Sequence, residues 1–280
     1  GYAGLVNGEL FKMDRKSVSD IINKGGTILR TARCVEFKQE EVREKAAGIL
    51  KAYGVDALVV CGGDGSFMGA KLLSKLGVKT VGLPGTIDND LPYTDYTIGF
   101  DTALNTIVED IGKLRDTSSS HERVSVIEVM GRNCGDLALF AGIAGGAEAI
   151  IVPELPFDKE ELIKTILEGK VNGKLHNIII LAEGVGGAED LAKEIEATTG
   201  IETRATILGH IQRGGSPSAM DTVLASRMGA KAVEVLLEGK TSRVIGIKAN
   251  EIFDMDIDEA LAIPRSFDEK LYNTANSINK

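Results

Sequence analysis

The residues with the clearest capacity for chemistry lie in residues 84–90, with the sequence Pro-Gly-Thr-Ile-Asp-Asn-Asp. Asp88 and Asp90 place two carboxylates two residues apart, and the hydroxyl of Thr86 precedes the first of them. One Asp could take a proton while the other holds a metal ion, although an ordinary Asx-type turn is the alternative. The apolar run at residues 80–83 predicts a buried strand in front of this loop. Ligands of open α/β sheets bind outside the carboxyl ends of strands, which favours function.

A second loop, residues 61–66, has the sequence Cys-Gly-Gly-Asp-Gly-Ser. It follows a predicted buried strand and precedes a predicted helix, so its glycines and the helix N-terminus could cradle a phosphate. Asp64 could hold a magnesium ion that screens the phosphates. A tight strand-to-helix turn is the alternative. The glycine spacing matches neither the Walker loop nor the dinucleotide fingerprint, which argues against a P-loop enzyme and a dehydrogenase.

Charged residues follow two further predicted strands. Arg132, in Met130-Gly131-Arg132, could clamp a phosphoryl oxygen, and Glu183 could accept hydrogen bonds from sugar hydroxyls. Either residue could equally be an ordinary charged cap of a strand.

Basic residues gather near residues 204–213. Arg204, His210 and Arg213, together with Arg123, could bind a phosphate dianion, whereas a solvated face and a structural histidine are the alternatives. The motifs together predict phosphoryl transfer from a magnesium-bound nucleotide to a phosphorylated small molecule, a reaction that depends mainly on positioning and charge stabilisation.

The composition limits the classes of function. The chain has 280 residues, of which 43% are hydrophobic, so we expect a globular protein without a membrane span. A net charge of −9 argues against nucleic-acid binding. The three cysteines are far apart and no signal peptide is visible, which favours the reducing cytoplasm over a disulfide framework or a structural zinc site.

Predicted strands and helices alternate, which indicates an α/β fold of two Rossmann-like, three-layer domains with mostly parallel sheets flanking an active-site cleft. Residues 1–99 plus 218–265 are expected to form a nucleotide-binding domain, and residues 100–217 plus 266–280 a sugar-phosphate-binding domain. Residues 1–12 are expected to be loop, and residues 116–121 a polar turn. Strands are predicted at residues 57–61, 80–83, 124–129, 149–152, 177–182, 203–208 and, last, 244–249. Helices are predicted at residues 17–24, 40–53, 67–76, 102–115, 135–146, 159–168, 188–199 and 219–237.

The order of these motifs resembles bacterial ATP-dependent 6-phosphofructokinase. The resemblance rests on residues 62–66, 84–90, 130–132, Glu183 and residues 209–217, and it covers essentially the whole chain. It implies glycolytic transfer of a phosphoryl group from Mg-ATP to the 1-hydroxyl of fructose 6-phosphate, giving fructose 1,6-bisphosphate and ADP. Asp88 would be the general base, with Thr86 beside it, and Arg132 would stabilise the transferring group.

The resemblance also implies the remaining roles. Magnesium would be held by Asp64 and Asp90, and the nucleotide by Tyr2, Arg33, Cys34, Gly63, Asp64, Gly65 and Ser66. The sugar phosphate would be held by Thr86, Asp88, Asp90, Met130, Gly131, Arg132, Glu183, His210 and Arg213, with Arg123 and Arg204 reaching in from a neighbouring subunit.

Family members are homotetramers with shared active and effector sites. Positions that match the effector site are Arg15, Asp20, Arg115, Glu148, Lys174 and His176. Pyrophosphate-dependent members usually carry Asp and Lys where this chain has Gly65 and Gly85, which leaves room for an α-phosphate and favours ATP.

One departure concerns the start of the chain. The family opens with a strand and a second glycine loop about forty residues ahead of the position that matches Gly1. We therefore expect this polypeptide alone to be poorly stable and weakly active, and activity at the family's normal level would refute that expectation. A non-catalytic protein that binds or senses phosphometabolites is the main alternative. A nucleotide-cofactor or lipid kinase also fits the glycine loop, but residues 210–217 count against it.

Overall fold

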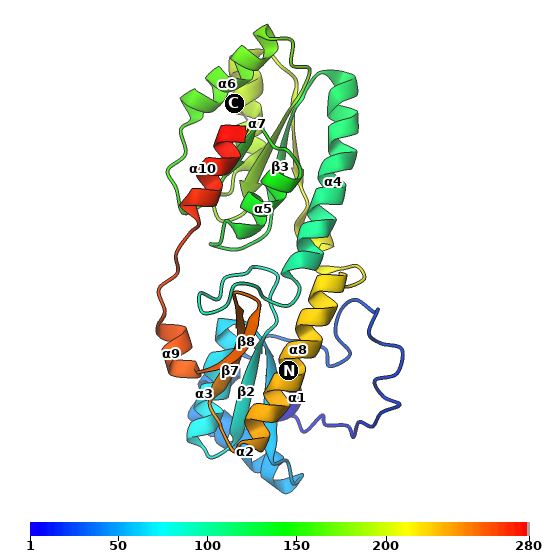
Figure 1. Cartoon of the computed structure of the whole chain (residues 1–280), viewed down its shortest axis with the longest axis vertical. Helices are drawn as coiled ribbons and strands as arrows, with labels where there is room; N and C mark the ends of the chain where they lie inside the picture. The colour runs from blue at the N-terminus through cyan, green and yellow to red at the C-terminus, as the bar shows by residue number, and fades with distance from the viewer. Residues whose placement is uncertain (279–280) are drawn as a thin grey trace. The chain divides into compact units, whose positions relative to one another are not determined.

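The computed structural model describes residues 1–278, which form two compact units (Figure 1). Unit 1 comprises residues 1–86, 91–99 and 215–265, and unit 2 comprises residues 87–90, 100–214 and 266–280. Each unit has its own sheet and its own hydrophobic core. The α/β architecture with two mostly parallel sheets is confirmed.

The sheet of unit 1 has the strand order β1-β2-β7-β8. Its strands are β1 (Ala57–Gly62), β2 (Lys79–Pro84), β7 (Arg243–Lys248) and β8 (Glu251–Asp256). The first three run parallel, and β8 pairs antiparallel with β7. Residue Gly62 at the end of β1 is paired with Pro84 at the end of β2, so the loops that follow these two strands leave the sheet side by side.

Helices cover both faces of this sheet. Helix α8 (Ala219–Leu237) packs against alternate residues of β2 and β7, whereas α3 (Asp64–Lys75) and α9 (Ile257–Ala262) contribute to a core on the other face. Helix α2 (Glu40–Ala52) packs on α3 through Ala46 and Leu50, the face that its apolar spacing predicts. The short helices α1 (Tyr2–Val6) and η1 (Val35–Lys38) complete the unit.

The sheet of unit 2 is fully parallel, with the order β4-β5-β3-β6. Its strands are β3 (Val124–Val129), β4 (Ala149–Ile151), β5 (Asn177–Ala182) and β6 (Thr203–Ile207). Strand β5 is buried along its whole length, as expected for a central parallel strand covered on both faces.

Helices α6 (Lys159–Val171) and α7 (Ala188–Thr199) form a core with one face of this sheet. Helices α4 (Phe100–His121) and α5 (Asp136–Ala144) also contact its strands, and Figure 1 shows α4 running alongside the sheet. Helix α5 approaches closely because a Cβ atom at Gly142 would collide with the side chain of Ile150. The turn η2 (Gly209–Arg213) follows β6, and α10 (Glu269–Ile278) packs on α5.

Several local predictions are wrong. The predicted helix at residues 17–24 consists of turns, because Asp14 Oδ1 accepts the N–H groups of Lys16 and Ser17, and this side chain competes with helical bonding. Residues 2–6, predicted as loop, form α1, whose Tyr2 ring stacks on Phe37 with 4.1 Å between the ring centroids.

The predicted polar turn at residues 116–121 instead continues α4 to His121. Its polar side chains bond back onto the helix: Ser120 Oγ donates to the Asp116 carbonyl at 2.9 Å. Ser118 is buried and its hydroxyl lies 2.5 Å from that of Ser125 in β3. Tertiary packing thus supports a helix that the polar composition argues against.

Two strand predictions also need correction. Strand β1, predicted to be buried, is an edge strand whose Val59 and Cys61 are exposed. The last strand is β8 and not β7; Ala249 and Asn250 join the two with φ angles of 48° and 66°. Two consecutive left-handed residues are typical of a tight hairpin turn, and Asn is the signal that the sequence offered for it.

Candidate active site

The glycine loop of unit 1 leads from β1 directly into the N-terminus of α3, with Gly63 as the N-cap residue. A Cβ atom at Gly62 would collide with the side chain of Ser66, so glycine is required where the loop turns. Asp64 is the first residue of α3 and is exposed. A loop that exposes backbone N–H groups at a helix N-terminus can bind phosphate.

The acidic loop begins beside the glycine loop. The Gly85 N–H donates to the Gly62 carbonyl at 3.0 Å, and a Cβ atom at position 85 would lie only 3.3 Å from the Gly62 nitrogen. The Thr97 hydroxyl donates to the Thr86 carbonyl at 2.6 Å and fixes the next residue. Thr86 therefore lies on a well-anchored backbone at the carboxyl edge of the unit 1 sheet.

Three other residues predicted to be near the nucleotide lie at the start of the chain. Tyr2 is packed against α3, and its hydroxyl donates to the Ser66 carbonyl at 2.5 Å, so it supports the glycine loop from within the unit. Burial raises the pKa of the Tyr2 hydroxyl. Arg33 is exposed, and the Cys34 thiol lies 3.7 Å from the Glu36 carboxylate, in a segment without regular secondary structure.

Asp88 and Asp90 share one cationic partner in unit 2. Arg132 Nε lies 3.2 Å from Asp88 Oδ2, and Arg132 Nη1 lies 3.6 Å from Asp90 Oδ2. The side chain of Asp88 is 10% exposed, whereas that of Arg132 is 61% exposed. Between the two carboxylates, Asn89 adopts a left-handed φ of 52° and its Nδ2 donates to Asp136 at 2.9 Å.

The surroundings of Asp88 suit a general base. Burial raises its pKa above the ordinary aspartate value, and the neighbouring Asp90 carboxylate raises it further. Arg132 opposes this rise, Glu183 adds to it, and Arg213 lowers it. A carboxyl with a raised pKa accepts a proton more readily than an ordinary aspartate does.

The Met130–Arg132 loop is held by side chains from neighbouring strands. Glu183 Oε1, just after β5, accepts the N–H groups of Gly131 at 3.1 Å and Arg132 at 2.7 Å. Gly131 and Arg132 have φ angles of 131° and 54°, so the turn is sharp. Glu183, predicted only as a partner for sugar hydroxyls, thus also shapes this loop.

The basic residues predicted as one phosphate site do not form a single group within one chain. His210 and Arg213 lie in η2 beyond the carboxyl end of β6 and are exposed. Arg123 precedes β3, and Arg204 is the second residue of β6, so both lie at the amino ends of these strands and pair with Glu202. The single-chain grouping is therefore wrong, because the strands separate the two pairs.

The two predicted metal ligands fit a magnesium ion that is held largely by phosphates. No group of three or more His, Cys, Asp or Glu side chains suited to a metal occurs among residues 1–278. Magnesium commonly binds to one or two carboxylates plus substrate phosphates and water, so Asp64 and Asp90 suffice as its protein ligands.

Four of the predicted effector-site residues gather in unit 2. Arg115 Nη1 lies 3.3 Å from His176 Nε2, and Arg115 also donates to the Gly146 carbonyl at 2.8 Å. Lys174 Nζ lies 3.1 Å from Glu148. The other two, Arg15 and Asp20, lie in the exposed segment of unit 1.

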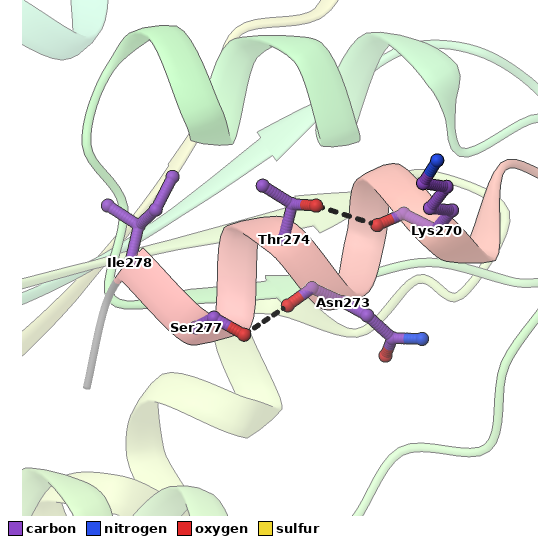
Figure 2. Close-up of a pocket in the computed structure, with 5 residues that line it drawn as sticks. All are labelled: Lys270, Asn273, Thr274, Ser277 and Ile278. Carbon is purple, nitrogen blue, oxygen red and sulfur yellow. Dashed lines mark hydrogen bonds between the residues drawn. The ribbon is translucent and has the colours of Figure 1, made fainter.

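A hollow elsewhere in unit 2 carries none of this chemistry. It is open to solvent and is lined by one side of α10 alone (Figure 2). The hydroxyls of Thr274 and Ser277 are bonded to carbonyls one turn earlier, as the dashed lines in Figure 2 show. It includes none of the predicted site residues.

Sequence reasoning missed three residues that support the site. Gln212 bonds the Met130 N–H, Glu154 Oε1 accepts the Gly135 N–H at 2.8 Å, and Asn89 bonds Asp136. Only Asn89, an Asn between two Asp residues, gave a local signal. The other two act on residues distant in the sequence, which no spacing reveals.

Comparison with known proteins gives the family. The family model described as phosphofructokinase matches residues 1–236. The chain belongs to the phosphofructokinase family. It is 85% identical, over 280 residues, to ATP-dependent 6-phosphofructokinase 1 of Clostridium perfringens, covering all of this chain and 88% of that protein. An ATP-dependent 6-phosphofructokinase of Clostridium acetobutylicum is 74% identical over the same shares of both chains.

Solved phosphofructokinase structures have the same fold. The phosphofructokinase of Saccharomyces cerevisiae matches with a TM-score of 0.88 at 39% identity, over 100% of this chain and 42% of that one. A pyrophosphate-dependent phosphofructokinase from Marinobacter aquaeolei matches with a TM-score of 0.81 at 24% identity, a likeness of fold alone.

Proposed function

We propose that this chain transfers a phosphoryl group from Mg-ATP to the 1-hydroxyl of fructose 6-phosphate, giving fructose 1,6-bisphosphate and ADP. The observation that carries the proposal is Asp88, a nearly buried carboxyl with a raised pKa that is paired with Arg132 in the loop after β2. The names of the relatives, ATP-dependent 6-phosphofructokinases at 70–85% identity, support the same reaction.

The reaction assigns one role to each part of the site. Asp88 accepts the proton of the attacking hydroxyl, and Arg132, freed from its ion pair, neutralises charge on the transferring group. Glu183 and the Met130–Arg132 loop hold the sugar, while His210 and Arg213 hold its 6-phosphate. Thr86 lies just ahead of the base.

Unit 1 would be the nucleotide-binding unit and unit 2 the sugar-phosphate-binding unit. In unit 1, Gly63, Gly65 and Ser66 would face the phosphates, with Asp64 as a ligand of magnesium. Bound magnesium would offset negative charge on the phosphates as the transfer proceeds. The glycines at positions 65 and 85 favour ATP over pyrophosphate as the donor.

The wider setting is also part of the proposal. We infer a homotetramer in which Arg123 and Arg204 of one subunit serve the active site of another, and an effector site that includes Arg115, Glu148 and Lys174. The three free cysteines support a cytoplasmic location. No helix within residues 1–278 has the length and apolarity that a membrane crossing needs.

A coupled assay tests the proposal. The purified chain is supplied with fructose 6-phosphate, magnesium and either ATP or pyrophosphate, and fructose 1,6-bisphosphate is measured directly. We expect product with ATP and little with pyrophosphate. Pyrophosphate as the better donor would contradict the donor assignment. Binding of both ligands without any product would contradict the reaction and favour a non-catalytic, phosphometabolite-binding role.

A further inference from the structure

Gln212 lies in η2 between the two residues proposed to hold the phosphate, yet its side chain points into the protein. The residue is 1% exposed. Its Oε1 accepts the Met130 N–H at 3.0 Å, and its Nε2 donates to the Gly209 carbonyl at 2.9 Å. Both ends of the buried amide are therefore bonded, one to the loop after β3 and one to the start of its own turn.

This cross-link stands where the β3–β6 ladder ends. The last paired residues are Glu128 and Ile207, and the Leu208 N–H makes a further bond to the Glu128 carbonyl at 3.1 Å. Beyond that point the chain after β6 turns into η2, so its backbone no longer pairs with the strand. The Gln212 side chain takes over, and it bonds the first of three consecutive N–H groups, of which Glu183 bonds the other two.

The cross-link joins two groups that the proposed reaction uses together. On one side, Met130 is two residues before Arg132, which pairs with Asp88. On the other, Gln212 directly precedes Arg213. Loss of the side-chain amide would leave the Met130 N–H buried without a partner, which favours a shift of the loop or the turn.

We propose that Gln212 is a positioning residue that holds the Arg132 loop and the phosphate-holding turn in one register. The assignment rests on the proposed function, because it takes Arg132 and Arg213 as parts of that site. Gln212 acts through these neighbours, since its own polar atoms are occupied within the protein. Its effect should therefore appear in the use of fructose 6-phosphate and not in the use of ATP.

The test compares Gln212→Leu and Gln212→Met with the parent chain. Both variants remove the amide at similar volume, and we expect KM for fructose 6-phosphate to rise about tenfold while KM for ATP stays within about twofold. Gln39→Leu is the matched control: Gln39 is exposed, lies in unit 1 and makes no side-chain cap bond to α2, so neither KM should change.

A double variant separates positioning from general damage. In an Arg213→Ala background, the phosphate contact is already lost, so Gln212→Leu should raise KM for fructose 6-phosphate by less than about threefold. A full tenfold rise there would overturn the coupling to Arg213. A fall in kcat with neither KM changed would indicate loss of folded enzyme, and failure of both Gln212 variants to fold would indicate a role in the fold; either result overturns the positioning role.

Failure of the inference is distinguishable from failure of the proposed function. If the parent chain forms no fructose 1,6-bisphosphate, the function is wrong and the inference falls with it. If the parent chain is active and the Gln212 variants match its KM for fructose 6-phosphate, only the inference is wrong.

Discussion

At the scale of single residues, Asp88 has conflicting surroundings. Burial and the Asp90 carboxylate favour its neutral form, whereas Arg132 favours its ionised form. The free carboxylate is the form that can take a proton, so activity should be lost on the acid side as Asp88 becomes protonated. The balance among these neighbours sets the pH at which this happens.

The acid limb of kcat/KM should respond in opposite directions to two substitutions. Asp90→Asn removes a negative charge that raises the Asp88 pKa, so the limb should move to lower pH. Arg132→Gln removes a positive charge that lowers this pKa, so the limb should move to higher pH. Both variants should also turn over more slowly, and the measurement is the midpoint of the limb and not its height.

Asp190→Asn is the control for this experiment, because Asp190 is an exposed residue of α7. Its acid limb should coincide with that of the parent chain. Shifts of the same sign for Asp90→Asn and Arg132→Gln would contradict the assignment of the limb to Asp88.

At the scale of elements, the site depends on loops at the carboxyl ends of strands and on how closely they approach. Gly184, after β5, is such a contact: a Cβ atom there would collide with the carbonyl oxygen of Arg132. That residue is already held in a left-handed conformation by the bonds of the loop to Glu183. The position of the Arg132 guanidinium is thus set partly by a glycine in another loop.

Gly184→Ala should therefore lower kcat by about tenfold or more, because displacement of the loop moves Arg132 away from the reacting group. Gly229→Ala is the control: Gly229 lies within α8 with open space at its Cβ position, and alanine should stabilise the helix by roughly 0.5–1 kcal/mol. Steady-state kinetics and thermal unfolding of both variants test this. Full activity of Gly184→Ala would contradict the role of close loop packing.

The sequence predicted much of the fold because its strongest patterns are local. The periodicity of α2 and α7, the apolar run of β5 and the helix-ending glycine at position 200 lie within single elements. Predictions failed where a distant contact decides the structure. The last turn of α4 is supported by the contact between Ser118 and Ser125, and β1 is an edge strand only because of the order of strands in the sheet.

The same distinction applies to the candidate site. Asp88 and Arg132 are predictable as residues with chemistry at strand ends, but their pairing depends on the fold. Gln212 carried no signal, since an amide beside a basic cluster gives no hint that it is buried. The grouping of Arg204 with His210 was misleading because nearness in the sequence spans the length of β6.

At the scale of the whole molecule, the positions of Arg123 and Arg204 matter most. They lie at the amino ends of β3 and β6, whereas His210 and Arg213 follow the carboxyl end of β6. A parallel strand keeps its two ends apart, so one chain cannot bring these pairs onto one phosphate. If all four serve one substrate, two arginines come from another subunit.

Mixing two inactive variants tests this arrangement. Arg204→Ala should lack the contribution to a neighbour's site, and Asp88→Ser should lack its own base. If they exchange subunits, some sites combine an intact base with an intact Arg204, and about a quarter of the parent activity should return on equal random mixing. No recovery, with subunit exchange shown by mass spectrometry, would place Arg204 in the site of its own chain or in no site.

The central claim is that Asp88 is the base of a fructose 6-phosphate kinase, and the turnover of Asp88→Ser tests it most directly. The coupled assay with Mg-ATP and fructose 6-phosphate should show a loss in kcat of roughly a thousandfold, with little change in the binding of either substrate. Asp190→Ser, the same change at an exposed position, should keep the activity of the parent chain. Turnover of Asp88→Ser near that of the parent would contradict the account.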